Sequence, residues 1–145
     1  MQGLDKNQAY RPLSDEPYMS PQQLEYFRTR LLEWRAELSL SCTEGLQHLQ
    51  EDWHHEPDIT DQATYESDRS FELRTKDRER KLIHKIDEAL QRIEDGTYGY
   101  CSETGEPIGF QRLEARPIAT LCIEAQEQHE KIEKTHKETM TPIED

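Results

Sequence analysis

The sequence predicts a mainly α-helical protein: a long antiparallel coiled-coil hairpin on a small globular head with a short β-hairpin and a C-terminal helix. Only 32% of the residues are hydrophobic and 34% are charged, whereas a compact domain contains roughly 45–50% apolar residues. Apolar residues recur at spacings of three and four through the middle of the chain. Two such segments of almost equal length flank a proline-containing break. An elongated helical pair with a thin core satisfies all of these observations.

The first arm of the hairpin is expected over residues 22–54. Ser20, Pro21 and Gln23 fit the N-cap, the first position and the third position of a helix. An apolar stripe follows at coiled-coil spacing, with a frame shift near residues 41–42 that resembles a stutter. The stripe consists of Leu24, Phe27, Leu31, Trp34 and Leu38, and then Leu46, Leu49 and Trp53.

The tip and the second arm are expected over residues 56–63 and 62–95. Pro57 disfavours helical geometry in the residue before it, and aspartates such as Asp58 and Asp61 form turns and N-caps. The second arm ends at Gly96, a residue type suited to a helix C-terminus. Its apolar residues are Leu82, Ile86, Ala89 and Ile93. Each arm would span about 50 Å.

Three further segments complete the predicted domain organisation. Residues 1–21 are expected to be an N-terminal arm that packs on the head. Residues 96–120 contain two short apolar runs around a turn and are expected to form a β-hairpin. Residues 121–145 are expected to form a helix, from Leu121 to about Lys137, and a tail.

Charge and hydropathy exclude several classes of function. The chain carries 31 acidic and 18 basic residues, for a formal net charge of -13. Autonomous nucleic-acid binding requires a basic surface, so direct DNA binding is not expected. No apolar stretch approaches the ~20 residues that span a bilayer, and the N-terminus lacks a signal-peptide core. We expect a cytoplasmic protein that contacts no membrane and, with three cysteines, has no disulfide framework.

The predicted tip is acidic. Eight acidic residues and no Lys or Arg lie between Glu44 and Asp68, and among them Asp58 and Asp61 precede Ala63. The plainer interpretation is helix punctuation on a solvated surface. An enzymatic Mg²⁺ site would also need a pocket that positions a substrate, so we expect no enzymatic activity. Carboxylates on a long arm could instead complete or perturb a partner's site.

A basic block follows on the second arm. It consists of Arg69, Arg74, Lys76, Arg78, Arg80, Lys81 and Lys85. Arg74, Arg78 and Lys85 fall close to one helix face. The plainer interpretation is a charged face that pairs with acidic neighbours, namely Asp68, Glu72, Asp77 and Glu79. The alternative is a site for a phosphorylated anion, because arginine forks match phosphate geometry.

The cysteines argue against a structural metal. Cys101 and Cys122 each begin a C-x2-C-like frame in which Thr104 and Ala125 occupy the second positions. Structural zinc needs four Cys or His ligands. His129 offers a third ligand, but no fourth is evident, so zinc is not expected. Cys42 is interpreted as a small packing residue and residues 54–55, a histidine pair, as surface.

Several sequence runs together resemble the DksA/TraR family of RNA polymerase-binding regulators over nearly the whole chain. The matching runs are residues 27–28 to 34–35, 57–63, 72–74, 77–83, 98–101, 108–109, 112–117 and 121–123. The DRERKLI and RLEARP runs are the most specific. The resemblance implies that the hairpin enters the polymerase's secondary channel without binding DNA. It also implies destabilisation of open promoter complexes together with guanosine tetraphosphate (ppGpp), repression of ribosomal RNA promoters and activation of some amino-acid biosynthesis promoters.

The resemblance also assigns expected roles to individual residues. The tip residues Asp58, Asp61 and Ala63 would lie near the polymerase active site. The positions implicated in the ppGpp response are Arg74, Arg78, Lys85 and Arg116, whereas Gln126 replaces a lysine of better-known members. We expect a monomer whose partners are RNA polymerase and ppGpp.

The family's head normally holds a four-cysteine zinc site, so this chain resembles the cysteine-poor members. The degenerate metal positions are Cys101, Thr104, Cys122 and Ala125. Thr104 and Ala125 are expected to fill the former metal volume. Additional packing is expected from Tyr98, Tyr100 and Ile123.

Three other functions compete with this one. A transcript-cleavage stimulator also uses acidic residues on a hairpin tip. A Mg²⁺-dependent phosphohydrolase would need the aspartate pair in a pocket. A coiled-coil scaffold protein would give no reason for an acidic tip beside a basic stalk.

Overall fold

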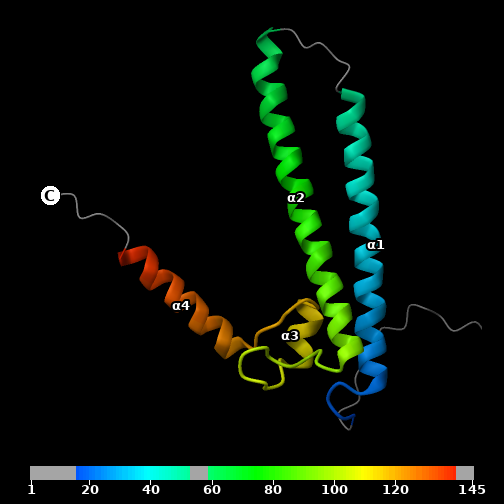
Figure 1. Cartoon of the computed structure of the whole chain (residues 1–145), viewed down its shortest axis with the longest axis vertical. Coiled ribbons are helices and arrows are strands. Elements are labelled where there is room, and N and C mark those ends of the chain that lie inside the picture. The colour runs from blue at the N-terminus through cyan, green and yellow to red at the C-terminus, as the bar shows by residue number, and fades with distance from the viewer. Residues whose placement is uncertain (1–15, 53–58, 140–145) are drawn as a thin grey trace, which may run out of the picture. The chain divides into compact units, whose positions relative to one another are not determined.

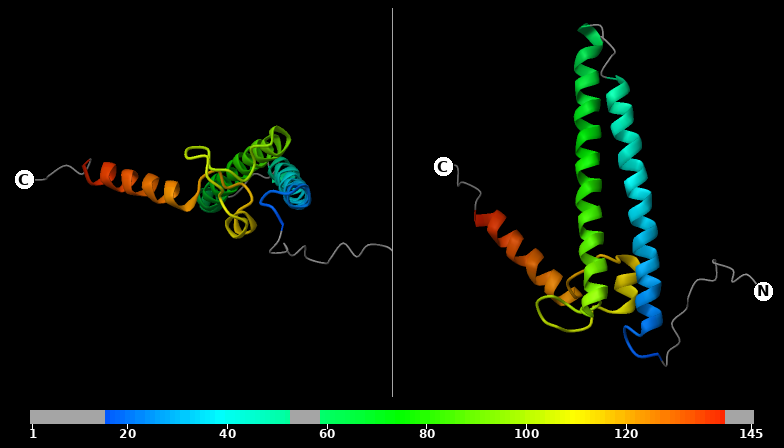
Figure 2. Two further views of the ribbon diagram at one scale, coloured as in Figure 1. Left: turned by 90° about the horizontal axis from the view of Figure 1, so that it is seen from below. Right: turned by 45° about the vertical axis from the view of Figure 1, so that its right-hand side comes forward.

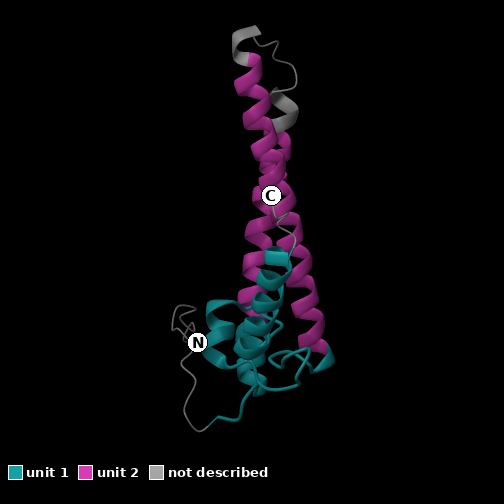
Figure 3. Ribbon diagram, turned by 90° about the vertical axis from the view of Figure 1, so that its left-hand side faces the viewer, with its two compact units in different colours: residues 1–27, 95–145 teal, residues 28–94 magenta. Residues whose placement is uncertain are grey.

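The computed structural model describes residues 16–52 and 59–139, without the side chains of residues 49–52 and 59–61. The described part contains four helices: α1 (Pro21–Asp52), α2 (Ile59–Asp95), α3 (Phe110–Ala115) and α4 (Ile123–Thr139) (Figure 1). The chain divides into two compact units (Figure 3). One unit comprises residues 28–94, and the other, here called the head, comprises residues 1–27 and 95–145. No described helix is long and apolar enough to cross a membrane.

The start of α1 is capped by the Ser20 side chain, as the sequence predicts, and the Gln23 side chain accepts a hydrogen bond from the residue before Ser20. The Gln23 N–H donates to Ser20 Oγ at 3.3 Å, and the Met19 N–H donates to Gln23 Oε1 at 2.9 Å. The first intrahelical bond runs from the Leu24 N–H to the Ser20 carbonyl at 3.0 Å. Pro21 is the first helical residue, where its missing N–H costs nothing.

In the unit of residues 28–94, α1 and α2 lie side by side and antiparallel (Figures 1 and 2). Arg35 on α1 contacts Asp87 on α2, and the later residue Ser41 contacts the earlier residue Glu79. The Arg35–Asp87 contact is a two-pronged ion pair, at 2.6 and 3.4 Å. The predicted mainly helical, coiled-coil fold class is confirmed.

Among the described side chains, the apolar seam of this pair is most deeply buried at the end that contains Leu31 and Ile86. Leu31 and Ile86 are fully buried, and Ala89 is 5% exposed. Leu46, predicted to continue the stripe, is 39% exposed, so the prediction is wrong at that position. The reason is that Lys76, rather than an apolar residue, faces α1 at this level. The predicted stripe residues at 49 and 53 lie outside the described side chains.

The second arm begins earlier than predicted. α2 starts at Ile59 rather than at residue 62, so Asp61 lies inside the first turn instead of capping it. A carboxylate in the first turn is favourable because the helix dipole is positive there. The predicted end is confirmed: α2 stops at Asp95, and Gly96 takes the left-handed conformation with φ 78°.

In the head, the predicted β-hairpin is reduced to one antiparallel bridge, between Tyr100 and Pro107. Hydrogen bonds of 2.8 Å flank it on both sides, and no strand is assigned among residues 16–52 and 59–139. Pro107 has no N–H to extend the ladder. Gly99 and Gly109, with φ of 91° and 102°, leave the extended conformation on either side.

The helices of the head differ in part from the prediction. Phe110, expected in the β-hairpin, begins the short helix α3, which the periodicity did not predict. Its buried residue is Leu113. The last helix, α4, begins and ends two residues later than the predicted helix over 121–137. The boundaries predicted for the four segments of the chain stay predictions.

Aromatic packing centres the head on Phe27. Its ring centroid lies 5.6 Å from that of Tyr98 and 5.3 Å from that of Phe110. The buried Tyr98 hydroxyl donates to the Pro117 carbonyl at 2.7 Å. The Tyr18 hydroxyl donates to the Gly99 carbonyl at 2.6 Å and accepts the Gly109 N–H at 3.0 Å. One tyrosine thus satisfies both backbone groups where the bridge ends.

Candidate functional site

The acidic tip is described only in part. Asp58 lies outside the described residues, and of Asp61 only the backbone is described, in the first turn of α2. Ala63 is exposed on the same helix. The roles expected for these three residues therefore stay predictions.

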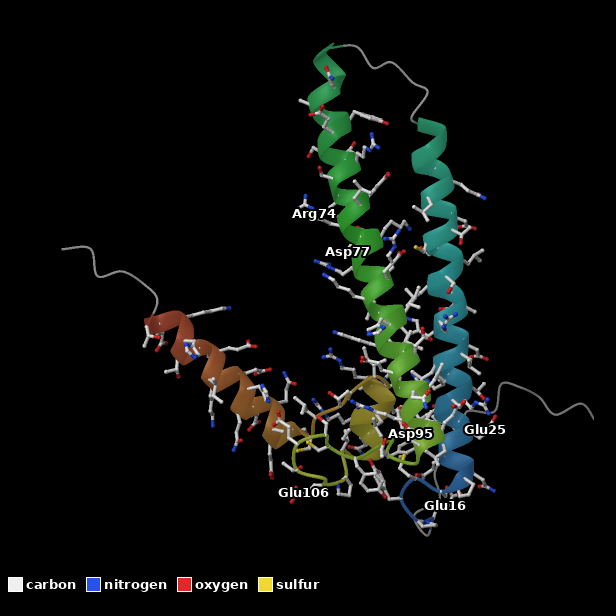
Figure 4. The ribbon with its side chains drawn as sticks, in the orientation of Figure 1. Glu16, Glu25, Arg74, Asp77, Asp95 and Glu106 are labelled. Atoms are coloured by element: carbon white, nitrogen blue, oxygen red, sulfur yellow. The ribbon has the colours of Figure 1, made fainter. Side chains whose placement is uncertain are left out.

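The basic block on α2 separates into an inner and an outer part. Lys76 points toward α1, where its Nζ donates to the Ser41 carbonyl at 2.8 Å. At 3.6 residues per turn, residues 74, 78 and 85 lie about 160° to 200° around the helix from Lys76. Figure 4 places Arg74 on the side of α2 away from α1. We call Arg74, Arg78 and Lys85 the basic face; all three are exposed.

The basic face is largely unneutralised within its unit. Arg74 Nε donates to the Ser70 carbonyl of its own helix at 3.3 Å, and Arg78 and Lys85 form no ion pair with any described residue. Lys81, by contrast, pairs with Asp77 at 3.0 Å. The plainer interpretation of mutual pairing thus holds for Lys81 and Lys76 but not for the basic face. This leaves the face chemically able to bind a multiply charged anion.

The remaining expected ppGpp position lies in the head. Arg116 is exposed at the C-terminus of α3, and Gln126 is half-buried on α4, where its amide donates to Glu130 at 3.2 Å. Arg116 and the basic face belong to different units of the chain.

Three of the four degenerate metal positions come together in the head, and the fourth, Ala125, is buried three residues after Cys122. Cys101, Cys122 and Ala125 are 3%, 7% and 3% exposed. Thr104 Oγ1 lies 3.8 Å from Cys122 Sγ and also hydrogen-bonds the Cys101 thiol. The threonine hydroxyl therefore links the two sulfur atoms through hydrogen bonds.

Hydrogen bonds favour the thiolate form of Cys101. Burial alone would raise the pKa of this thiol. The Thr104 side chain and the backbone groups of Cys122, Thr104 and Glu103 outweigh it and lower the pKa from 9.0 to about 6. Because the folded-state pKa is depressed, these bonds stabilise the fold fully above the ordinary pKa, and that contribution is lost as the pH falls through about 6.

Comparison with known proteins places this arrangement in a family. Residues 23–93 match the model of the DnaK suppressor protein DksA N-terminal domain, and residues 96–131 match the prokaryotic dksA/traR C4-type zinc finger. A protein of Caulobacter vibrioides named RNA polymerase-binding transcription factor DksA is 56% identical over 135 residues, covering 93% of this chain and 95% of that protein. The chain belongs to the DksA family.

Two more distant DksA proteins agree with this assignment. The Escherichia coli K12 protein of the same name is 44% identical over 117 residues, covering 81% of this chain and 78% of that protein. The structure of transcription factor DksA2 from Pseudomonas aeruginosa matches with a TM-score of 0.76 and 46% identity, covering 81% of this chain and 90% of that one. These DksA relatives are named as transcription factors rather than as enzymes.

The DksA zinc-finger model implies a four-thiolate site, and the residues present do not fit it. Two of the four positions carry a hydroxyl and a methyl group, and no cluster of three His, Cys, Asp or Glu side chains suited to a metal occurs among the described residues. His129 supplies no third ligand to the cysteines here: its Nε2 lies 2.5 Å from Glu103 Oε1, with the ring 49% exposed.

The packing expected around the former metal volume is confirmed only in part. Tyr98 is 2% exposed, as expected. The prediction is wrong for Ile123, whose side chain is 56% exposed. Tyr100 is 39% exposed, and its ring centroid lies 5.7 Å from that of Tyr18. Ile123 is the first residue of α4, and the buried face of that helix is provided by Ala125 instead.

Sequence reasoning missed the role of Lys76. The sequence places it in the basic block, but its side chain is 14% exposed and pairs with Glu79. Gly45 is the residue in the sequence that could indicate this role. Glycine destabilises the middle of a long helix, so its presence there suggests that another side chain packs closely against it.

Proposed function

We propose that this chain is an RNA polymerase-binding transcription regulator that enters the secondary channel, destabilises open promoter complexes and acts with ppGpp. The observation that supports this most is the match to a relative named RNA polymerase-binding transcription factor over 93% of this chain and 95% of that protein. The shared length includes both helices of the pair and the head.

The helical pair suits a docking arm. At 1.5 Å per residue, the 32 residues of α1 extend about 48 Å. In this proposal Asp58, Asp61 and Ala63 act beside the polymerase's own metal site. Negative charge delivered there changes the stability of the open complex without any reaction catalysed by this chain. The net charge of -13 agrees with docking on protein rather than on DNA.

The proposed ppGpp contact uses the basic face, and Arg116 of the head stays a further expected position in the ppGpp response. The exposed guanidinium groups match phosphate groups bidentately, whereas Lys85 adds a point charge. Gln126 contributes no charge, so this chain has one fewer cationic contact than it would with lysine. The nucleotide would bind between these residues and the polymerase.

The first test measures the lifetime of open complexes at a ribosomal RNA promoter. The chain should shorten the lifetime, further with ppGpp, and should not stimulate cleavage of the transcript in a backtracked polymerase. Cleavage without an effect on the lifetime would instead support the transcript-cleavage alternative. A coiled-coil scaffold protein would change neither quantity.

We further propose that the head is held together without zinc. The hydroxyl of Thr104, bonded to both cysteines, and the buried Ala125 occupy the positions of two ligands. Neither side chain can replace a thiolate in a closed tetrahedral site. Hydrogen bonding and apolar packing would then do what the metal does in four-cysteine heads.

Removal of metal should therefore leave this protein unchanged. Elemental analysis should find no stoichiometric zinc, and circular dichroism should show the same helix content in strong chelator. The matched variant Thr104→Cys/Ala125→Cys restores four thiolates and should acquire zinc. About one zinc per wild-type chain, with unfolding on chelation, would contradict the proposal.

A further inference from the structure

A closed ring of polar contacts joins α1 to α2 within the unit of residues 28–94. Lys76 Nζ donates to the Ser41 carbonyl at 2.8 Å and to Glu79 Oε2 at 3.1 Å, and Ser41 Oγ donates to Glu79 Oε1 at 3.0 Å. The side chains of Lys76 and Glu79 are only 14% and 16% exposed. Each oxygen of the Glu79 carboxylate thus has its own donor, and the ring uses both helices.

Gly45 provides the space that Lys76 occupies. A Cβ atom at residue 45 would lie 1.9 Å from Lys76 Cε and 2.4 Å from Nζ. Glycine inside a helix costs about 1 kcal/mol relative to alanine, and Gly45 lies one turn after Ser41 in the interior of α1. A larger residue at this position has to displace Lys76, and the ring with it.

The ring stands where apolar packing no longer fixes the pairing of the helices. Leu31 and Ile86 are fully buried at one end of the pair, whereas Leu46 and Phe71 are 39% and 68% exposed beyond the ring. Apolar seams tolerate sliding of one helix along the other. A buried polar group at a seam position fixes the register, at a cost in stability.

We propose that Ser41, Lys76 and Glu79, seated on Gly45, form a register lock of the α1–α2 pair. The lock determines which residues of the two helices stand opposite each other on the way to residues 56–63. Its residues are positioning residues: they orient the end of the pair for the proposed action on RNA polymerase, and this role rests on that proposed function.

The test removes both charges together, because removal of one would leave a buried charge unpaired. The variant Lys76→Met/Glu79→Leu should melt at the same temperature as the wild type or higher, but should lose its single register. Spin labels at Leu40→Cys and Arg80→Cys, both exposed positions, report the register as a distance. Both labelled proteins also carry Cys42→Ser, which removes the half-buried thiol. The Cys42→Ser protein without the two added cysteines is the control that measures how far Cys101 and Cys122 are labelled.

The wild-type pair should give one narrow distance distribution. The variant should give a broad or split one, since a slip of one turn shifts the distance by about 5 Å. The matched control Lys81→Met/Asp77→Leu removes an exposed ion pair from the same helix and should keep the narrow distribution, as should Lys76→Arg. A narrow distribution in Lys76→Met/Glu79→Leu would overturn the lock.

The same variants separate positioning from binding. Lys76→Met/Glu79→Leu should still bind RNA polymerase but lose most of its effect on open-complex lifetime, and Lys76→Arg should retain that effect. A slipped register with a full effect on the lifetime would overturn the positioning role. If the wild-type chain has no effect on the polymerase, the proposed function fails, and the label distances still decide whether the lock exists.

Discussion

The variant Asp58→Asn/Asp61→Asn should fold normally, bind RNA polymerase as the wild type does and lose most of its regulation of promoters. Asparagine keeps the turn-forming and capping ability of aspartate but removes the charge. The cost to the fold is at most one helix cap, about 1 kcal/mol. Function should fall because the proposed effect needs negative charge beside the polymerase's metal site.

Two quantities have to be measured on the same preparation of this variant: polymerase affinity and open-complex lifetime. The matched control is Glu66→Gln/Asp68→Asn, which removes two charges further along α2 and should change neither. If affinity and function fall together, the tip is a docking element. If neither falls, the interpretation of the aspartates as helix punctuation is correct.

The second large effect is expected on the basic face. Arg78→Ala should weaken the synergy with ppGpp and leave the basal effect on open complexes partly intact. Arg78 is exposed and forms no ion pair with a described residue, so its removal breaks no ion pair in the described part of the chain. The measurement is the open-complex lifetime over a range of ppGpp concentrations.

Two further variants sharpen the nucleotide prediction. Arg80→Ala removes an equal charge from another side of α2 and should leave the synergy unchanged. Gln126→Lys should strengthen the synergy, because it restores a cation at the position where better-known family members carry lysine. No change from either Arg78→Ala or Gln126→Lys would move the nucleotide site elsewhere.

The parts of the fold that follow local rules could be predicted from the sequence. The cap at Ser20, the left-handed Gly96 and the apolar periodicity that contains Leu31 and Ile86 can each be recognised from residues a few positions apart. The predicted start of α2 lies three residues after the observed start at Ile59, because an aspartate is favourable both as a cap and in the first turn.

The parts that were missed depend on contacts between distant residues. Nothing in the local pattern tells that Lys76 reaches Ser41, 35 positions earlier, or that His129 pairs with Glu103. The bridge at Tyr100 and Pro107 is shorter than predicted because two glycines and a proline limit it. For the candidate site, spacing alone identified the basic face, whereas its separation from Lys76 needed the structure.

The most direct test of the proposed function is equilibrium binding of the purified chain to RNA polymerase core enzyme in the absence of DNA. A fluorescently labelled chain should bind saturably, and excess unlabelled chain should displace it. The Asp58→Asn/Asp61→Asn variant should compete equally well. Binding that requires DNA, or no saturable binding to the core enzyme, would contradict the account.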